Sequence, residues 1–174
     1  VLYVLLLLSA VFLSSDAYDF LFMVFGLACL YEYNRLVLLK GYYIFLGYLA
    51  LWWVFIYLTR DPLLIQALLL LTIAVNVGLI VYLFTAKQKP FNILQKYLIG
   101  LFYLGGGCIF LTMIPYQDDF FAKYLIMGIF IMIWVNDSFA YLVGKTLGRH
   151  KLYPAVSPKK TIEGSMGGLV FTLT

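Results

Sequence analysis

WVNDSFAYLVGKTLGRHKLYPAVSPKKTIEG, residues 134–164, is a polar interruption in an otherwise apolar chain. It contains an aspartate, Asp137, that follows an apolar run, and five of the chain's twelve Lys and Arg residues then fall between Lys145 and Lys160. No acidic residue interrupts this basic run before Glu163. A carboxylate beside concentrated cations, at the end of an apolar segment, marks the part of the chain where we expect the chemistry to occur.

The composition of the whole chain indicates a membrane protein. Of its 174 residues, 64% are hydrophobic and 11% are charged, and the mean hydropathy is +0.98. Soluble domains are typically about 45–50% apolar and about 25% charged. We therefore predict an all-α, polytopic integral membrane helical bundle, in which residues 1–174 form a single transmembrane domain.

The ends of the chain and its two cysteines give little indication of function. The chain begins at Val1 and ends at Thr174 inside a new apolar run, so we expect the N-terminal and central part of a longer protein. Residues 1–13 lack the basic segment and the small-residue cleavage site of a signal peptide. Cys29 and Cys108 lie singly in apolar runs without metal or redox spacing, and we expect both to be buried.

Apolar segments divide the chain into predicted membrane spans. A helix needs about 20 apolar residues to cross a bilayer. Six spans and the start of a seventh are predicted at residues 1–13, 20–39, 42–58, 63–84, 98–114, 120–143 and 164–174. Asp16 and Asp19 are expected in the first connection, and Pro62 at the first position of the fourth span. The run Gly105-Gly-Gly107 predicts close helix packing or a kink.

Basic residues alternate along the predicted connections. Ten of the twelve Lys and Arg residues fall in even-numbered connections: Arg35, Lys40, Lys87, Lys89, Lys96, Lys145, Arg149, Lys151, Lys159 and Lys160. The odd-numbered connections hold Arg60 and Lys123 together with five aspartates: Asp16, Asp19, Asp61, Asp118 and Asp119. Because basic connections stay in the cytoplasm, residues 144–164 are predicted to form a cytoplasmic basic loop.

Asp137 requires an explanation within its span. An aspartate at a helix centre costs about 2.5–3.5 kcal/mol on insertion scales, so it calls for a cation, a metal or a water-filled cavity. Helical spacing places Tyr141 on the same face. A stripe of small residues lies beside it: Ala140, Gly144 and Gly148. The alternative is a helix end that reaches the lipid headgroups, with Asp137 paired to Lys145 or to another local cation.

The octapeptide SPKKTIEG, which begins at Ser157, is more specific. Ser157 and Pro158 predict the N-cap and the first position of a helix. The free amides of that helix, flanked by Lys159 and Lys160, would bind phosphate oxygens. Glu163 would hold a lysine or help to coordinate a metal. The alternative is a basic loop that attracts anionic lipid headgroups.

Two further polar features are assigned simpler roles. His150, the one histidine of the chain, is expected to be solvated or to contact phosphate rather than to be catalytic. Glu32 and Arg35 are three residues apart near the cytoplasmic end of the second span, and we expect them to form a structural pair.

Three short motifs together resemble the phosphatidate cytidylyltransferases, also called CDP-diacylglycerol synthases. They are Asp137-Ser-Phe-Ala-Tyr141, Gly144-Lys-Thr-Leu-Gly-Arg149 and the SPKKTIEG octapeptide. That family is similar in showing Asp-x-x-Ala-Tyr, Gly-[Arg/Lys]-x-x-Gly-[Arg/Lys] and Ser-Pro-Lys-Lys-Thr-x-Glu-Gly in this order. Tyr31-Glu-Tyr-Asn-Arg35 also resembles the Glu-x-x-Arg of their second apolar segment. The family's further signature, with Pro-Gly-His-Gly-Gly and Asp-Arg, would lie beyond Thr174.

The resemblance implies transfer of a cytidylyl group from CTP to phosphatidic acid, which gives CDP-diacylglycerol and pyrophosphate for phospholipid synthesis. It implies catalytic roles for Lys159, Lys160 and Glu163, substrate binding by Arg149, Ser157, Thr161 and Lys145, and metal binding by Asp137. The implied cofactor is Mg²⁺ or another divalent cation. The implied setting is a bacterial inner membrane, with the site facing the cytoplasm. The implied partners are the two substrates and membrane lipids but no nucleic acid, and the resemblance leaves open whether the protein forms a homodimer. Residues 1–174 would then lack part of the catalytic set.

Two other functions remain as alternatives. A CTP-dependent polyprenol or phytol kinase resembles this family but phosphorylates a lipid alcohol, and the complete SPKKTIEG run favours the cytidylyltransferase over it. A transporter or non-enzymatic membrane scaffold is the alternative from another class. The scarcity of charge within the first five spans gives little support for an ion pathway.

Overall fold

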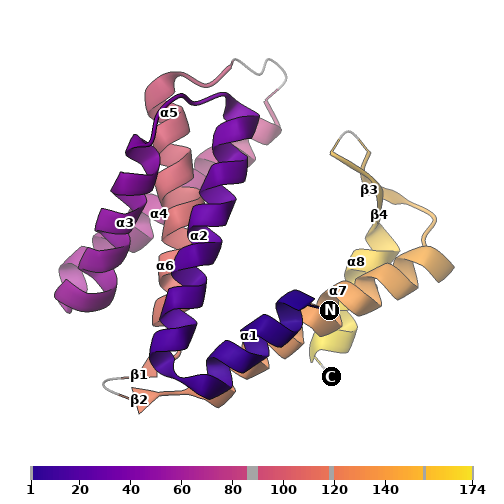
Figure 1. The fold of residues 1–174 in the computed structure, drawn as a ribbon. Coiled ribbons are helices and arrows are strands. Elements are labelled where there is room, and N and C mark those ends of the chain that lie inside the picture. Colours follow the sequence, from indigo (N-terminus) through magenta and orange to yellow (C-terminus); the bar gives the residue numbers. More distant parts are fainter. Residues whose placement is uncertain (1, 86–89, 118–119, 155, 174) are drawn as a thin grey trace. The chain divides into compact units, whose positions relative to one another are not determined.

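The computed structural model describes residues 2–85, 90–117, 120–154 and 156–173, and these are mostly helical (Figure 1). The α-helices are α1 (Leu2–Leu13), α2 (Ser15–Val37), α3 (Tyr43–Trp53), α4 (Pro62–Leu83), α5 (Ile93–Leu98), α6 (Gly106–Met113), α7 (Lys123–Thr146) and α8 (Ile162–Leu173). Two π-helical segments continue or join them: η1 (Val54–Leu58) and η2 (Ile99–Gly105). The strands form two antiparallel hairpins: β1 (Tyr116–Gln117) with β2 (Phe120–Phe121), and β3 (Lys151–Tyr153) with β4 (Ser157–Thr161).

The chain divides into two compact units. The first comprises residues 1–121 and the second residues 122–174. The first contains the helices from α1 to α6, and the second contains α7, the β3–β4 hairpin and α8.

The helices confirm the predicted class, a helical membrane protein. Within the described residues, four helical segments are long and apolar enough to cross a membrane: Ser15–Val37, Pro62–Leu83, Ile93–Met113 and Lys123–Thr146. The shorter apolar helical segments are Tyr3–Leu13, Tyr43–Leu58 and Ile162–Leu173. Each of the seven predicted apolar segments therefore contains a helix, and four of these helices reach the length of a crossing.

Two helices begin at residues other than those predicted, because capping residues determine where they start. α2 begins at Ser15 because the Ser14 side chain accepts a 3.0 Å hydrogen bond from the Ala17 N–H. Asp16 and Asp19 therefore lie inside α2, and their predicted place in a connection is wrong. α5 begins at Ile93, where Asn92 and Gln95 form a reciprocal capping box.

The predicted start of the fourth span is confirmed. α4 begins at Pro62, and the Asp61 carboxylate accepts a 2.9 Å hydrogen bond from the Leu63 N–H. Proline is favoured at this position because the first N–H groups of a helix have no partner within the helix. The predicted connection residues Lys87, Lys89, Asp118 and Asp119 lie outside the described residues.

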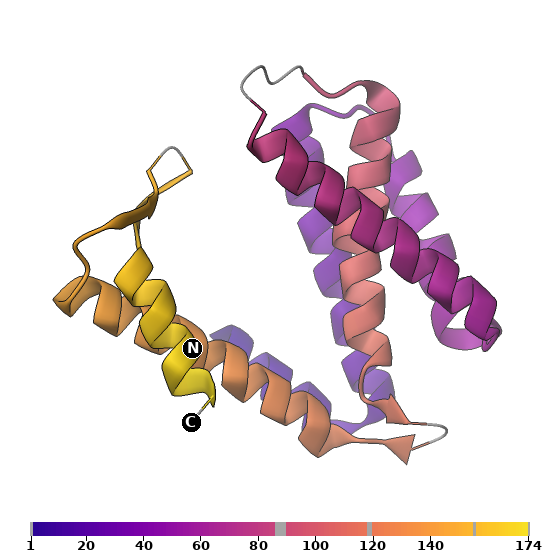
Figure 2. The ribbon, with the colours of Figure 1, turned by 180° about the vertical axis from the view of Figure 1, so that it is seen from behind.

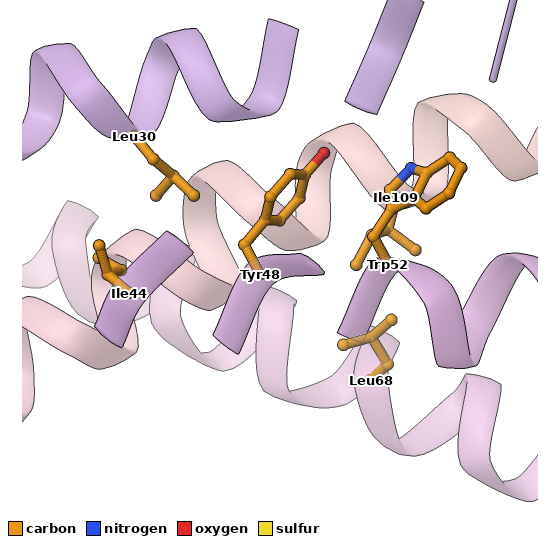
Figure 3. Close-up of a cluster of buried hydrophobic side chains, with 6 residues drawn as sticks. All are labelled: Leu30, Ile44, Tyr48, Trp52, Leu68 and Ile109. Carbon is orange, nitrogen blue, oxygen red and sulfur yellow. The ribbon is translucent and has the colours of Figure 1, made fainter. Parts of the chain in front are cut away.

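A buried cluster holds the helices of the first unit together (Figure 3). Ile44, Tyr48 and Trp52 lie at i, i+4 and i+8 on one face of α3, which places them in a single row. Leu30 from α2, Leu68 from α4 and Ile109 from α6 complete the cluster.

The glycine run confirms the prediction of close packing. A Cβ added at Gly105 would lie 3.0 Å from the Tyr48 ring, and one at Gly106 would lie 2.5 Å from Thr72 Oγ1. Since such distances leave no room for a methyl group, these two glycines let α3 and α4 approach. At Gly107 a Cβ would meet open space.

Two expected side-chain roles in the first unit are wrong. Cys108 is half-buried, but Cys29 is exposed, and an exposed thiol is tolerated on a surface that faces lipid because its neighbours there are apolar. Among the described residues Glu32 forms no ion pair with Arg35, whose guanidinium instead lies 6.0 Å from the centre of the Tyr31 ring.

The first unit is an antiparallel bundle of α2, α3, α4 and the α5–η2–α6 segment (Figures 1 and 2). Since the chain direction alternates from one helix to the next, basic residues gather at one end of this bundle: Arg35, Lys40 and Lys96. Asp16 and Asp61 lie at the opposite end. Within this unit, the alternation of charge along the sequence thus becomes a separation of basic and acidic residues between the two ends of the bundle.

Candidate functional site

The polar stretch of the second unit is built on two closely packed helices, α7 and α8. Small residues lie at the contact between the two helices: Ala140 and Gly144 of α7 face Gly164 and Gly168 of α8, and Gly167 of α8 lies against Val143. A Cβ added at Gly164 would lie 2.7 Å from the Ala140 carbonyl oxygen and 3.0 Å from Gly144 Cα. Small residues at such positions allow two helix backbones to approach in a membrane. Two residues of the small-residue stripe predicted beside Asp137, Ala140 and Gly144, therefore pack against α8, while the third, Gly148, lies against Thr161.

The SPKKTIEG octapeptide begins as a strand, so the helix predicted from Ser157 is wrong. Ser157–Thr161 forms β4, which pairs with β3 in the register Lys151↔Thr161 and Tyr153↔Ser157, with an irregularity between them. Pro158 is compatible with a two-stranded ribbon because each strand has an edge that needs no N–H donor. The described part of residues 144–164 thus contains the end of α7, the β3–β4 hairpin and the start of α8 (Figure 1).

Thr161, and not Ser157, caps the start of α8. It is buried, and its hydroxyl accepts a 3.2 Å hydrogen bond from the Gly164 N–H, as an N-cap residue does. Its hydroxyl would also lie 3.0 Å from a Cβ built on Gly144, so Thr161 fills the space between the two helices. This position gives Thr161 a capping and packing role.

Glu163 ties the start of α8 to the turn that follows α7. Its carboxylate accepts hydrogen bonds from the Arg149 N–H at 3.1 Å and from the His150 N–H at 3.2 Å. His150 Nδ1 lies 2.6 Å from Glu163 Oε1, and an ionised carboxylate can only accept, so this nitrogen carries the proton. The hydrogen bond from His150, with those from the backbone, lowers the pKa of Glu163 to about 2.

Four predicted phosphate-binding cations have exposed side chains. Lys159 and Lys160 lie on β4, Arg149 lies in the turn after α7, and Lys145 lies in the last turn of α7. The Lys145 ammonium is 5.9 Å from the centre of the Tyr141 ring. These cations are therefore available to an anionic ligand, since no described carboxylate pairs with them.

Asp137 is exposed on α7, where it belongs to a stripe with Tyr141 and Lys145 at i, i+4 and i+8. It forms no ion pair with Lys145, so the alternative of a local pair is not what the structure shows. Among the described residues, no hydrogen-bond partner of the Asp137 carboxylate is found. A carboxylate in this state can bind a cation from outside the chain.

The carboxylates do not form a complete metal site within the described residues. No group of three or more His, Cys, Asp or Glu side chains gathers there. The oxygens of Glu163 are already bonded to Arg149 and His150, which leaves Asp137 as the available acidic ligand of the polar stretch. Mg²⁺ in nucleotide sites is commonly held by one or two carboxylates together with substrate phosphates. Asp137 fits one ligand of such an ion.

Several residues of this site were not predicted from the sequence. Asn136 packs on α8, because a Cβ built on Gly168 would lie 2.7 Å from its Oδ1. The spacing of Gly144 with Gly148, and of Gly164 with Gly168, is the G-x-x-x-G pattern of close helix pairs. That pattern could have predicted that α7 and α8 pack together.

The fold and this stretch define a helical membrane protein with a basic polar site at the junction of α7, the β3–β4 hairpin and α8. The model of the cytidylyltransferase family matches residues 1–174, and the chain belongs to that family.

Curated relatives carry the name phosphatidate cytidylyltransferase. The protein of that name from Aquifex aeolicus (strain VF5) is 37% identical over 95 residues, which cover 55% of this chain and 35% of the relative. One from Staphylococcus aureus (strain COL) is 41% identical over 76 residues, which cover 44% of this chain and 28% of the relative. The matched segments thus span about a third of these relatives. No solved structure matches the chain.

Proposed function

We propose that this chain is part of a membrane enzyme that transfers a cytidylyl group from CTP to phosphatidic acid. The observation that carries the proposal is the set of exposed cations on the β3–β4 hairpin and at the end of α7, the helix that also carries Asp137. Among the described residues neither these cations nor Asp137 has an ion-pair partner. Membership of the cytidylyltransferase family and the names of the curated relatives support it. The products would be CDP-diacylglycerol and pyrophosphate.

The reaction needs no nucleophile from the protein. An oxygen of the phosphatidate phosphate attacks the α-phosphorus of CTP, the bond from that phosphorus to the bridging oxygen breaks, and pyrophosphate leaves. The protein's contribution is to hold the two phosphate groups in line and to neutralise their charge. Lys159, Lys160, Arg149 and Lys145 are suited to this task because their cationic ends are exposed and carry no carboxylate partner among the described residues.

Three other residues take supporting roles in this proposal. Asp137 would be one ligand of a divalent cation, which when bound supplies further neutralisation of the triphosphate. Ser157 lies half-buried where β4 begins, and it would contribute a hydroxyl or backbone contact. Glu163, first expected to be catalytic, acts as a positioning residue, because its bonds fix the backbone of Arg149 and His150.

The proposed setting follows from the charge distribution. The basic residues of the polar stretch would lie on the cytoplasmic side of a bacterial inner membrane, where CTP is available. Phosphatidic acid would reach the site from the membrane. An assembly of two copies is compatible with this proposal but not required by it.

An assay with CTP labelled at either the α- or the γ-phosphorus tests the reaction in the complete natural protein. Cytidylyl transfer places the α-label in the lipid, whereas a lipid kinase places the γ-label there, and a transporter or scaffold places neither. Lys160→Ala and Asp137→Ala should each reduce incorporation of the α-label severely. Lys151→Ala, on β3 of the same hairpin, is the matched control and should retain activity. Near-normal activity in both site variants would refute these assignments.

A further inference from the structure

A cavity of about 570 Å³ lies at the basic end of the first unit, and none of its lining residues belongs to the proposed reaction. It is formed by the last turn of α2, the connection that follows and the beginning of α3. Its lining combines two cations, Arg35 and Lys40, with Tyr31, Tyr42 and apolar side chains. The cavity therefore offers positive charge beside apolar surface.

Asn34 adds an unmet hydrogen-bond acceptor to this cavity. Asn34 is one of the lining residues and is only 8% exposed. Its Oδ1 is buried and has no hydrogen-bond partner among the described residues. Because buried polar atoms are normally paired, rotation of this side chain toward a donor on a bound molecule would complete the group.

The backbone carbonyls at the end of α2 would repel an anion if they were free, because a helix C-terminus carries partial negative charge. Several are already satisfied here. The Asn34 carbonyl accepts from the Leu39 N–H at 3.1 Å, and the Val37 carbonyl accepts from Lys96 Nζ at 2.6 Å. Arg35 and Lys40 thus remain to attract an anion to the cavity.

The rim of the cavity suits the boundary between lipid and water. Leu38 has a left-handed backbone conformation, with φ of 54°, and its side chain is 82% exposed. Tyr42 is 81% exposed. Exposed apolar and aromatic side chains beside cations are typical of contacts with acyl chains and headgroups at a membrane interface.

We propose that this cavity binds the headgroup of an anionic phospholipid that also carries a hydroxyl donor, as phosphatidylglycerol does. Arg35 and Lys40 bind the phosphodiester, and a headgroup hydroxyl donates to Asn34 Oδ1. The acyl chains lie against Leu38 and Tyr42. This lipid is a ligand and is not consumed, so the site is independent of the proposed transfer reaction.

Native mass spectrometry of the purified full chain in detergent tests the ligand class. Three lipids with identical acyl chains serve as probes: phosphatidylglycerol, phosphatidylmethanol and phosphatidylcholine. Phosphatidylmethanol has the same charge as phosphatidylglycerol but no headgroup hydroxyl. We expect phosphatidylglycerol to bind roughly tenfold more tightly than phosphatidylcholine, with phosphatidylmethanol between them. Equal affinity for the two anionic lipids would overturn the role of Asn34, and this comparison needs no variant.

Variants test the position of the site. Arg35→Gln combined with Lys40→Gln should reduce the affinity for both anionic lipids to that for phosphatidylcholine. Asn34→Ala should remove only the difference between phosphatidylglycerol and phosphatidylmethanol. Lys151→Gln removes one charge outside the cavity and should change neither affinity. The proposal is overturned if the double variant binds phosphatidylglycerol as the unaltered chain does, or if Lys151→Gln lowers the affinity equally.

Discussion

Glu163 and His150 join the first turn of α8 to the turn that leaves α7, with His150 Nδ1 2.6 Å from Glu163 Oε1. The same carboxylate accepts the N–H groups of Arg149 and His150, and the His150 carbonyl accepts the Ile162 N–H at 2.9 Å. These hydrogen bonds therefore fix the turn after α7 and the start of α8 relative to each other. Because Arg149 is one of the proposed phosphate-binding cations, this connection determines where its backbone lies.

Loss of the Glu163 carboxylate should loosen the turn locally. Glu163→Gln replaces one acceptor oxygen with an NH₂ group, which cannot accept the backbone N–H groups it would face. We expect trypsin to cut after Arg149 and Lys151 several-fold faster in the variant, as measured from the rate at which the fragments appear. Glu32→Gln is the matched control, and an equal rate in both variants would show that Glu163 does not hold the turn.

The pH dependence of this connection follows from the lowered pKa of Glu163. A carboxylate with a folded-state pKa of about 2 and an ordinary value of 4.5 stabilises the fold fully above pH 4.5. This stabilisation is lost as the pH falls from 4.5 through 2. The chain contains two glutamates, so carboxyl-¹³C-glutamate labelling should give two titrations by NMR, and Glu32→Gln assigns them. A midpoint near 4.5 for Glu163 would contradict the hydrogen bonds described.

Contact between α7 and α8 should make Gly164 intolerant of a side chain. Gly164→Ala places a methyl group 2.7 Å from the Ala140 carbonyl oxygen, so the helices must separate, at a cost of about 1–3 kcal/mol. Gly128 lies on α7 with open space around its missing Cβ. Gly128→Ala should be neutral or stabilise by up to about 1 kcal/mol through helix propensity. Thermal unfolding in detergent measures both, and equal melting temperatures would argue against the close contact.

Two variants distinguish the capping hydrogen bond of Thr161 from the packing of its methyl group. Thr161→Val preserves the shape of the side chain but removes the acceptor for the Gly164 N–H, and it should cost about 1 kcal/mol. Thr161→Ser retains the hydroxyl and loses only the methyl group. Hydrogen exchange should therefore be faster at the Gly164 amide in the valine variant than in the serine variant. The reverse order would indicate that packing of the methyl group, and not the cap, dominates.

A buried acid, Asp19, lies in the first unit. Asp19 is 3% exposed, and the Tyr116 hydroxyl donates a 2.8 Å hydrogen bond to its Oδ2, while its Oδ1 has no partner among the described residues. Tyr116→Phe should destabilise this unit by about 1–3 kcal/mol, because the second oxygen also loses its donor. Tyr103→Phe is the control, since its ring is 45% exposed. A similar small decrease in melting temperature for both would exclude a special role for the Asp19–Tyr116 bond.

Local rules predicted the features that depend on neighbouring residues. The Asp61–Pro62 start of α4 follows from the unpaired amides of a helix N-terminus, and it was correctly predicted. The start of α2 was not, because an N-cap at Ser14 outweighed the absence of a continuous apolar run around Asp16 and Asp19. Exposure of Cys29 was missed as well, since an apolar pattern does not distinguish a core from a surface that contacts lipid.

Composition and the spacing of residues along the chain are sufficient to predict the class of protein, the apolar segments and the basic stretch with its short motifs. The conformation of that stretch and the partners of its side chains depend on contacts made in the folded chain. Ser157 and Pro158 are compatible with a helix start when considered alone, but β3 supplies a pairing strand. Thr161 became the cap, and Glu163 became the link to His150, because Gly144 and Gly164 bring two helices close enough for these contacts. Contacts between residues distant in sequence arise only when the chain is folded, and this is the physical reason for the division.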